Sequence, residues 1–294
     1  MLIIVLACVL GVLIVAYAPF VTMAWTSRNR FAFPAAGVTM DAPGPEFVRE
    51  DLWLPVERGA DGADPSTVHA WWIGAAQPES AGTMLFFHGN GYPLENEVKN
   101  EAPALKRIGA NLLLMDYRGY GFSNPVKPTA ATAAADARAG LSYLTQDRGI
   151  PIEQIWICGR SIGSVVAVRL AREFPHCAGL ILLSPITNTL DVKPFRKFTW
   201  PLRWLGLAKD FDSRKRITGL TTPLLIVTGT EDAIATPAMA TILHSRAAGP
   251  KRLEIIEGTT HSIWRRPQDC ERIPTLIAEM MNKRDKTLGA DVDV

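Results

Sequence analysis

A serine between two glycines is the first residue of this chain that could do chemistry. The segment Gly159-Arg160-Ser161-Ile162-Gly163 follows an apolar run at 154–158 and precedes a stretch with helical periodicity at 162–173. This pattern predicts a sharp turn from a strand into a helix, and the glycines leave the room that the turn needs. Such a turn exposes the serine hydroxyl, and the next backbone N–H points at the oxygen that becomes negative during attack on a carbonyl. We therefore expect Ser161 to be a nucleophile and the Ile162 N–H to be an oxyanion donor.

Two more predicted strands end in residues that a nucleophilic serine needs. Asp232 comes shortly after one apolar run, and His261 comes shortly after the next. A serine hydroxyl is a poor nucleophile at neutral pH, so an imidazole must accept its proton while a carboxylate orients the ring. We expect Ser161, Asp232 and His261 to form this catalytic triad. Glu231 and Asp191 are rival acids, but Glu231 lies earlier in the turn and Asp191 lies beyond the expected loop.

A glycine-rich loop, His88-Gly89-Asn90-Gly91, follows the predicted strand at 83–87. We expect the backbone N–H of Asn90 to be the second oxyanion donor, and one such donor is worth about 3 kcal/mol of transition-state stabilisation. His88 precedes the glycine, so we expect its ring to structure the loop through hydrogen bonds rather than to act as the base. The residues expected to support the loop and the turn are His88, Gly89, Gly159 and Gly163.

The elements that must position these residues alternate between apolar runs and amphipathic stretches. Apolar runs separated by helices, without clean polar alternation, predict a mostly parallel central sheet covered by helices on both faces. Residues just after such strands meet at one edge of the sheet, where ligands bind. Turn residues between the first two runs predict a hairpin. The expected strands are 47–56, 68–73, 83–87, 111–116, 154–158, 179–183, 224–228 and 252–256, and the expected helices are 94–108, 130–144, 162–173, 238–247 and 267–281.

The N-terminal segment is uncharged from residue 2 to residue 25. At about 1.5 Å per residue, a helix of this length spans a hydrocarbon core of about 30 Å. We expect residues 1–27 to be a transmembrane anchor or uncleaved signal, followed by a tether rich in Pro, Gly and Ala at 28–45. Arg28 and Arg30 follow the segment and favour a cytoplasmic catalytic domain by the positive-inside rule. A cleaved signal peptide, and hence a periplasmic or secreted domain, is the alternative.

Residues 46–281 are expected to form the catalytic domain, with a short cap at 189–222 and a disordered polar tail at 282–294. The cap mixes aromatic and basic residues, a combination that suits an anionic membrane interface. The alternative is that the aromatic side chains pack over the sheet while the charges face solvent. The aromatic residues of the cap are Phe195, Phe198, Trp200 and Trp204, and its basic residues include Lys193, Arg196 and Arg203.

Composition excludes several other classes of protein. The chain has 294 residues, 48% of them hydrophobic, which is too apolar for a disordered chain. Its 31 Lys+Arg against 29 Asp+Glu give a net charge of +2, far too balanced for a typical nucleic-acid binder. The four cysteines have no paired spacing, so they indicate neither a disulfide framework nor a zinc site. Because no phosphate-binding loop, dinucleotide fingerprint or HExxH motif is present, we expect no cofactor and no metal.

Six motifs together carry a family resemblance: FFHGNG, DYRGYGFS, GRSIG, SPIT, GTEDAIATP and TTHSIW. They resemble the α/β-hydrolase superfamily, and the likeness covers about residues 45–281. More narrowly, the chain is similar to the small, lid-poor, membrane-anchored branch related to serine-aminopeptidase-like hydrolases and eukaryotic protein depalmitoylases. The resemblance implies an α/β-hydrolase fold. It also implies Ser161 as nucleophile, Asp232 as acid and His261 as base, with the amides of Asn90 and Ile162 as the oxyanion hole.

These features predict a membrane-anchored serine hydrolase that cleaves a carboxylic ester or thioester of a small-molecule or lipid-like acyl substrate. An aminopeptidase-like amide hydrolase is the alternative within enzymes. That activity needs an acidic site for the amino terminus of the substrate, and Glu95 and Glu97 are the acids near the oxyanion loop. A catalytically silent membrane scaffold is the alternative from another class. The intact set of Ser161, Asp232, His261 and the HGNG loop argues against it, because a scaffold needs none of them.

Overall fold

The computed structural model of this chain describes most of the expected catalytic domain. For residues 95–100 and 283–290 it describes the backbone alone. The described residues are 11, 15, 17–19, 22, 29, 32–37, 48–56, 66–77, 82–91, 93–192 and 209–290.

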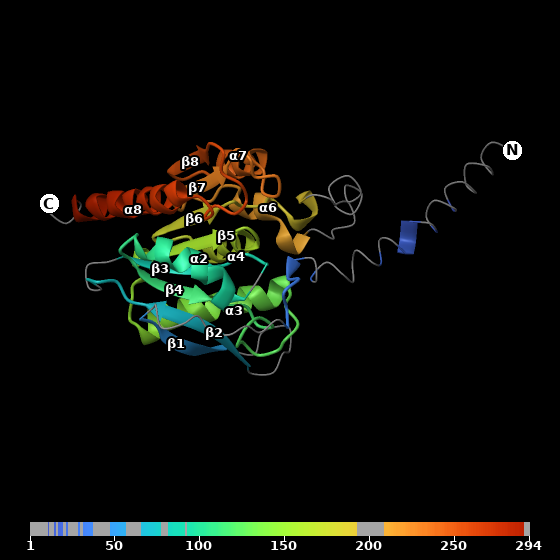
Figure 1. Cartoon of the computed structure of the whole chain (residues 1–294), viewed down its shortest axis with the longest axis horizontal. Helices are drawn as coiled ribbons and strands as arrows, with labels where there is room; N and C mark the ends of the chain where they lie inside the picture. Colours follow the sequence, from blue (N-terminus) through green and yellow to red (C-terminus); the bar gives the residue numbers. More distant parts are fainter. Residues whose placement is uncertain are drawn as a thin grey trace.

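Eight strands in the described part of the chain form one sheet (Figure 1). Their order is β1-β2-β4-β3-β5-β6-β7-β8. The first two strands pair as the predicted antiparallel hairpin, β2 is also antiparallel to β4, and all other neighbours are parallel. The strands are β1 Glu50–Val56, β2 Ser66–Ile73, β3 Thr83–Phe87, β4 Asn111–Met115, β5 Ile155–Arg160, β6 Gly179–Leu183, β7 Leu224–Gly229 and β8 Lys251–Ile256.

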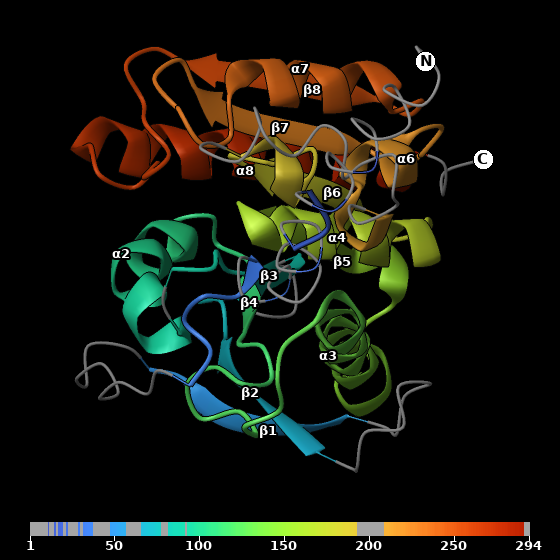
Figure 2. The same ribbon diagram turned by 90° about the vertical axis from the view of Figure 1, so that its right-hand side faces the viewer.

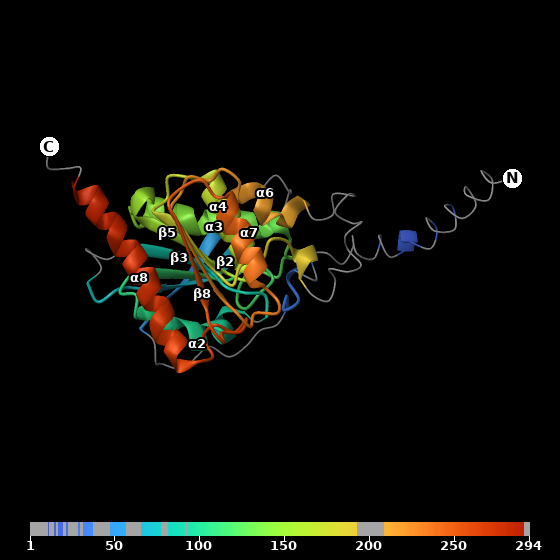
Figure 3. The ribbon, with the colours of Figure 1, turned by 90° about the horizontal axis from the view of Figure 1, so that it is seen from above.

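Helices cover both faces of the sheet, as predicted (Figure 3). Helices α3, α4, α6 and α7 pack on one face, and α2 and α8 pack on the other. Within the first group, α3 and α4 lie side by side (Figures 2 and 3). The helices are α2 Leu94–Lys106, α3 Ala130–Ser142, α4 Ile162–Glu173, α6 Ser213–Ile217, α7 Pro237–Arg246 and α8 Pro267–Ala290, and α3 continues as a π-helical turn over Tyr143–Asp147.

The two layers of helices explain why the strands are apolar along their whole length. Successive side chains of a strand point to opposite faces, so both faces must be buried. In β3, Leu85 and Phe87 face the α3 and α4 side, whereas Met84 and Phe86 face the α2 and α8 side. All four are at most 1% exposed. Each buried side chain of this size stabilises the fold by about 1.5–3 kcal/mol, which holds the strand ends in place for the site.

Three boundaries differ from the sequence expectation. Helix α8 continues to Ala290, whereas we expected a disordered tail from residue 282. The residues there include Lys, Arg and Leu, which all have high intrinsic helix propensity. Residues 32–37, expected within the tether, instead pack into the domain, because Phe33 is a large apolar side chain and is 1% exposed. The bounds of α6 within the cap were not predicted, because five residues are too few for a periodic pattern.

The predicted anchor at 1–27 and most of the aromatic and basic part of the cap, 193–208, lie outside the described residues apart from a few positions in the anchor. Among the residues that the structure describes, no helix has the length and apolar character needed to span a membrane.

Candidate active site

The turn from β5 into α4 has the geometry that the two glycines predict. Ser161 sits between the two elements with φ 53° and ψ −117°, a backbone conformation that L-residues rarely adopt. A Cβ on Gly159 would lie 2.2 Å from the carbonyl oxygen of Gly163, and a Cβ on Gly163 would lie 2.2 Å from that of Phe87. Neither position therefore admits a side chain. The Ser161 N–H donates to the carbonyl of Leu183 at 3.0 Å, which fixes the turn to β6.

The three predicted triad residues form one chain of hydrogen bonds. His261 Nε2 lies 3.0 Å from Ser161 Oγ, and His261 Nδ1 lies 2.9 Å from Asp232 Oδ2 and 3.1 Å from Oδ1. A carboxylate only accepts, so Nδ1 carries the proton and donates to Asp232. The lone pair of Nε2 then faces the Ser161 hydroxyl and can accept its proton. Asp232 is itself held by the N–H groups of Ile234 and Ala235, which donate to Oδ1 at 2.9 and 2.7 Å.

The carboxylate of Asp232 is kept ionised by its surroundings. Burial raises the pKa of Asp232, but four contacts together outweigh that effect and leave its pKa below the usual value. These contacts are the hydrogen bond to His261, the attraction of that ring when it is protonated, the Ala235 N–H and the hydroxyl of Ser184. The Ser184 hydroxyl is close to the Asp232 carboxylate, but the two do not form a hydrogen bond of normal geometry. An ionised Asp232 can stabilise the imidazolium that forms when His261 takes a proton.

Backbone contacts between the β7 and β8 loops set the spacing of Asp232 and His261. A Cβ on Gly229 would lie 1.9 Å from the carbonyl oxygen of Thr259, so the two loops touch where Asp232 begins its turn. The N–H of Glu231 donates to that same carbonyl at 3.0 Å, while its side chain is exposed. The other rival acid, Asp191, accepts from Thr187 Oγ1 at 2.5 Å and pairs with an arginine. The structure therefore brings Asp232, and neither rival, to His261.

The loop that carries the predicted oxyanion donor lies beside the nucleophile. Strands β3 and β5 are parallel neighbours, and Phe87 pairs with Gly159, so both strands end at the same edge of the sheet. Asn90 is the third residue after the end of β3. Ile162 is the first residue of α4, and its N–H is one of those that have no partner within a helix. Two backbone donors from these two positions fit the role of an oxyanion hole.

His88 has the structural surroundings that its position predicts. The ring is fully buried, its Nδ1 donates to the Gly89 carbonyl at 2.6 Å, and its Nε2 lies 3.0 Å from Asp116 Oδ1. The Tyr117 hydroxyl donates to the His88 carbonyl at 2.8 Å. These contacts tie the loop to the end of β4. His88 contacts none of the triad side chains through these bonds, which leaves His261 as the base.

A buried ion pair next to the nucleophile was not anticipated from the sequence. Arg160, directly before Ser161, pairs through Nε with Glu101 of α2, whose side chain is 1% exposed. The same guanidinium packs on the loop, because a Cβ on Gly89 would lie 3.2 Å from Arg160 Nη2. Burial and the charge of Glu101 also raise the pKa of the Cys158 thiol well above its usual value, so that thiol stays protonated. Within an amphipathic helix Glu101 looks like a surface residue, so no sequence signal marked it.

The N-terminal segment 32–37 reaches the oxyanion loop through two tyrosines. The Tyr120 hydroxyl lies 3.3 Å from the Ala35 N–H, which donates to it, and 3.3 Å from the Asn90 carbonyl, to which it donates. The Phe33 ring packs edge-on against the rings of Tyr117 and Tyr120 at 5.5 and 6.3 Å. Both tyrosines belong to the DYRGYGFS motif, whose role in the site is thus to brace the loop that holds Asn90.

Two further expectations concern the acids near the oxyanion loop and metal binding. The side chains of Glu95 and Glu97 lie outside the described residues. Among the residues that the structure describes, no group of three or more His, Cys, Asp or Glu side chains is arranged to hold a metal ion.

A strained serine turn after the fifth strand, with an aspartate and a histidine after the last two strands of a mostly parallel eight-stranded sheet, defines an α/β-hydrolase. A family model described as alpha/beta hydrolase fold matches residues 82–211. The chain is 31% identical over 244 residues to Uncharacterized protein MT2364 of Mycobacterium tuberculosis, covering 82% of this chain and 83% of that one. It is 33% identical over 186 residues to Alpha/beta hydrolase domain-containing protein 17B of Homo sapiens, covering 63% and 62%. The chain belongs to the α/β-hydrolase superfamily.

Solved structures show the same fold. The Pyrococcus furiosus esterase Pf2001 superposes with a TM-score of 0.65 at 19% identity, covering 85% of this chain and 98% of that one. A puromycin-hydrolyzing peptidase of Mycobacterium tuberculosis superposes with a TM-score of 0.64 at 14% identity, covering 82% of this chain and 40% of that one. One neighbour is an esterase and the other a peptidase, so the fold alone does not choose between ester and amide chemistry.

Proposed function

We propose that this protein is a serine hydrolase that cleaves carboxylic esters or thioesters through an acyl-enzyme on Ser161. The observation that carries the proposal is the continuous hydrogen-bonded chain from Ser161 through His261 to Asp232. Three residue types from three separate strand ends meet in the order and at the distances that nucleophilic catalysis requires. The esterase among the structural neighbours and the hydrolase relatives support the same class of reaction.

In the acylation step, Ser161 Oγ attacks the carbonyl carbon of the substrate while His261 Nε2 accepts the hydroxyl proton. The carbonyl oxygen becomes negative and is held by the N–H groups of Asn90 and Ile162. The carbon–oxygen or carbon–sulfur bond to the leaving group then breaks, and His261 returns the proton to that leaving group. Asp232 stabilises the imidazolium throughout.

In the deacylation step, a water molecule takes the place of the leaving group. His261 accepts a proton from this water as it attacks the acyl carbon, and the second tetrahedral intermediate is held by the same two N–H groups. The bond between the carbon and Ser161 Oγ then breaks, the hydroxyl regains its proton from His261, and a carboxylic acid leaves.

A second part of the proposal concerns location. The uncharged segment at residues 2–25 supports a single-pass anchor, and Arg28 and Arg30 support a catalytic domain on the cytoplasmic side. Membrane fractions washed with alkaline carbonate should retain the full chain, and protease added outside intact cells should leave the domain uncut. A protein recovered in the soluble or secreted fraction with its N-terminus removed would contradict anchorage.

Covalent labelling tests the catalytic proposal. A fluorophosphonate probe should label the full chain in detergent, and Ser161→Ala and His261→Ala should abolish labelling. Ser245→Ala and His176→Ala change the same residue types at exposed positions and should label like the wild type. Aryl esters, acyl thioesters and aminoacyl anilides then separate the chemistries. Turnover of the anilides alone would favour the amide hydrolase, and no labelling of folded wild type would favour a silent scaffold.

A further inference from the structure

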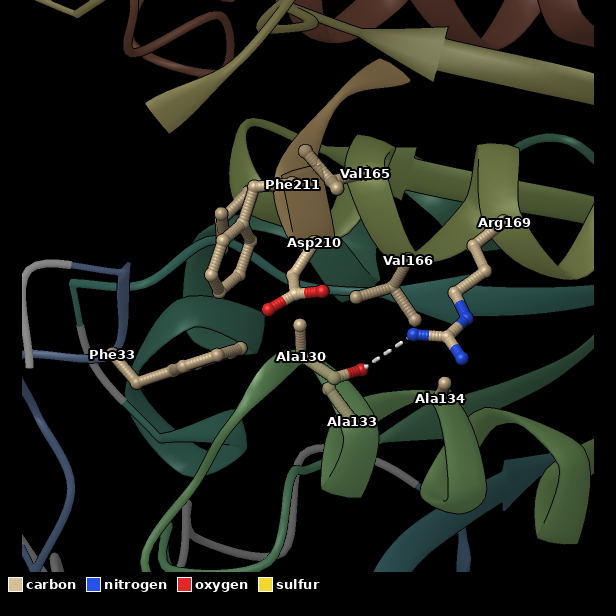
Figure 4. A pocket seen from close by; sticks show the side chains of 10 residues that line it. Phe33, Ala130, Ala133, Ala134, Val165, Val166, Arg169, Asp210 and Phe211 are labelled. Atoms are coloured by element: carbon tan, nitrogen blue, oxygen red, sulfur yellow. Dashed lines mark hydrogen bonds between the residues drawn. The ribbon is translucent and has the colours of Figure 1, made fainter. Parts of the chain in front are cut away.

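The nucleophile and the base of the triad are supported in different ways. Ser161 directly precedes α4, which lies against α3, and Arg169 Nη1 donates across the two helices to the Ala130 carbonyl at 3.1 Å (Figure 4). His261 lies instead in the loop between β8 and α8, where the residues on either side of it are at least partly exposed. The position of the base therefore depends on what holds this loop.

Two buried residues flank the base in this loop. Ile263, two positions after His261, is fully buried in the core on the α2 and α8 side of the sheet. Thr259, two positions before His261, is 1% exposed, and its carbonyl accepts the Glu231 N–H at 3.0 Å. Because Glu231 directly precedes Asp232, the place of Thr259 sets how the loop of the base lies against the loop of the acid.

The side chain of Thr259 is held by two residues at the start of α8. Asp269, in the first turn of this helix, is 1% exposed, and its Oδ2 accepts the Thr259 hydroxyl at 2.9 Å. Arg266 donates to the same carboxylate through Nε at 2.8 Å and through Nη2 at 2.9 Å. Its Nη2 also donates to Thr259 Oγ1 at 2.6 Å and to the Glu257 carbonyl at 2.7 Å. We call Thr259, Arg266 and Asp269 the Thr259 clasp.

The bonds of the clasp hold the loop rather than the helix. A buried carboxylate is unfavourable unless it is paired with a cation and hydrogen-bonded, and Asp269 has both kinds of partner. Its place in the first turn of α8 adds a favourable interaction with the helix dipole. Helix α8 itself is attached to the sheet by apolar side chains such as Ile273 and Ile277, which are fully buried. What the clasp adds is therefore the place of the loop that carries His261.

We propose that Arg266 and Asp269 are positioning residues for His261 and act on the geometry of the triad through Thr259. The inference rests on the proposed serine hydrolase and adds two residues outside its triad. With the clasp intact, the loop keeps the His261 imidazole within 3.0 Å of both of its triad partners. A misplacement of about 1 Å at a reacting group costs about a hundredfold in rate, so a small displacement of the loop has a measurable effect.

Substitutions in the clasp, made in the full chain in detergent, test the inference. Thr259→Val removes the hydroxyl and Asp269→Asn removes the charge, and each keeps the shape of the side chain. With p-nitrophenyl acetate, each should lower kcat about tenfold or more and leave KM within about twofold, because His261 serves both acylation and deacylation. Thr259→Ser keeps the hydroxyl and should keep kcat within about threefold of the wild type. Glu279→Gln is the matched control, because it removes an exposed bond of 2.9 Å from Arg252 that also joins β8 to α8.

A spectroscopic measurement separates positioning from stability. The proton that His261 Nδ1 shares with Asp232 should give a proton NMR resonance downfield of the amide region, assigned by its loss in His261→Ala. The wild type, the serine variant and the control should show this resonance. The two clasp variants should show it shifted or broadened at a temperature where thermal unfolding finds them folded. If Asp269→Asn does not fold, Arg266→Gln at a partly exposed position takes its place, with the same expected loss of kcat.

The outcomes separate this inference from the proposed function. If the clasp variants lose thermal stability alone and keep the kcat and the downfield resonance of the wild type, the positioning role is wrong and the serine hydrolase stands. An equal loss of kcat in Glu279→Gln would show a general effect of loosening α8 and would also overturn the positioning role. If fluorophosphonate does not label the folded wild type, the proposed function is wrong and the inference falls with it.

Discussion

The strained backbone at Ser161 leads to a stability prediction of unusual sign. A non-glycine residue in so sparsely populated a conformation stores about 1–3 kcal/mol, which glycine would release. In the middle of an ordinary helix or strand, by contrast, glycine makes a protein less stable than alanine does, by about 0.5–1 kcal/mol. Ser161→Ala and Ser161→Gly both lose the hydroxyl and its bond to His261, so they differ in one methyl group and in backbone freedom. We therefore expect Ser161→Gly to be more stable than Ser161→Ala by about 1 kcal/mol.

A control pair makes the sign informative. Arg138 is exposed in the interior of α3, where Arg138→Gly should be less stable than Arg138→Ala by about 1 kcal/mol. Thermal unfolding of the full chain in detergent, followed by tryptophan fluorescence, measures all four variants. A difference of 1 kcal/mol corresponds to about 2–4 °C in Tm for a domain of this size. If Ser161→Gly melts below Ser161→Ala by the same margin as the control pair, the turn is not strained and the reasoning fails.

Three further predictions concern the surroundings of the nucleophile. The lowered pKa of Asp232 means that its ionised form stabilises the fold above about pH 3.9 and loses that contribution as pH falls through the folded pKa. In chemical denaturation, the stability gap between wild type and Asp232→Asn should thus shrink below about pH 4, whereas a gap unchanged at pH 3 would contradict it. Gly163→Ala places a methyl against backbone and should cost at least about 1–3 kcal/mol of unfolding free energy and all labelling. Gly74→Ala, whose Cβ would meet Trp72 Nε1 at an ordinary contact distance of 4.0 Å, should be tolerated in both assays. Glu101→Leu removes the buried carboxylate that pairs with Arg160 and should cost about 3–5 kcal/mol of unfolding free energy, and adding Arg160→Met should restore part of it. Simple additivity of the two changes would refute the pairing.

The fold and the triad could be predicted because their signals are local in the sequence. Apolar runs of strand length predict the strands of the sheet. They also predict where the site lies, because parallel strands bring the residues that follow them to one edge of the sheet. Ser161, Asp232 and His261 each follow such a run, so their order along the chain was enough to pair them. The roles of Gly159 and Gly163 could also be predicted, because only residues without a side chain permit the turn at Ser161.

The rest of the site depends on contacts that sequence spacing does not encode. Glu101 lies in a polar helix and reaches Arg160 only when α2 packs on the sheet. Phe33 lies in a segment rich in Pro, Gly and Ala that indicates a tether, yet its ring fits among Tyr117 and Tyr120 and is buried. The Thr259 clasp forms only when the first turn of α8 lies against the loop that follows β8.

Detection of the acyl-enzyme tests the central claim most directly. The full chain in detergent is mixed with a p-nitrophenyl ester, quenched in acid within the first turnover and examined by intact and peptide mass spectrometry. We predict a mass increase of one acyl group, located on the peptide that contains Ser161 and accompanied by a burst of p-nitrophenol, with neither seen in Ser161→Ala. An acyl group on another residue, or full turnover by Ser161→Ala, would contradict the account.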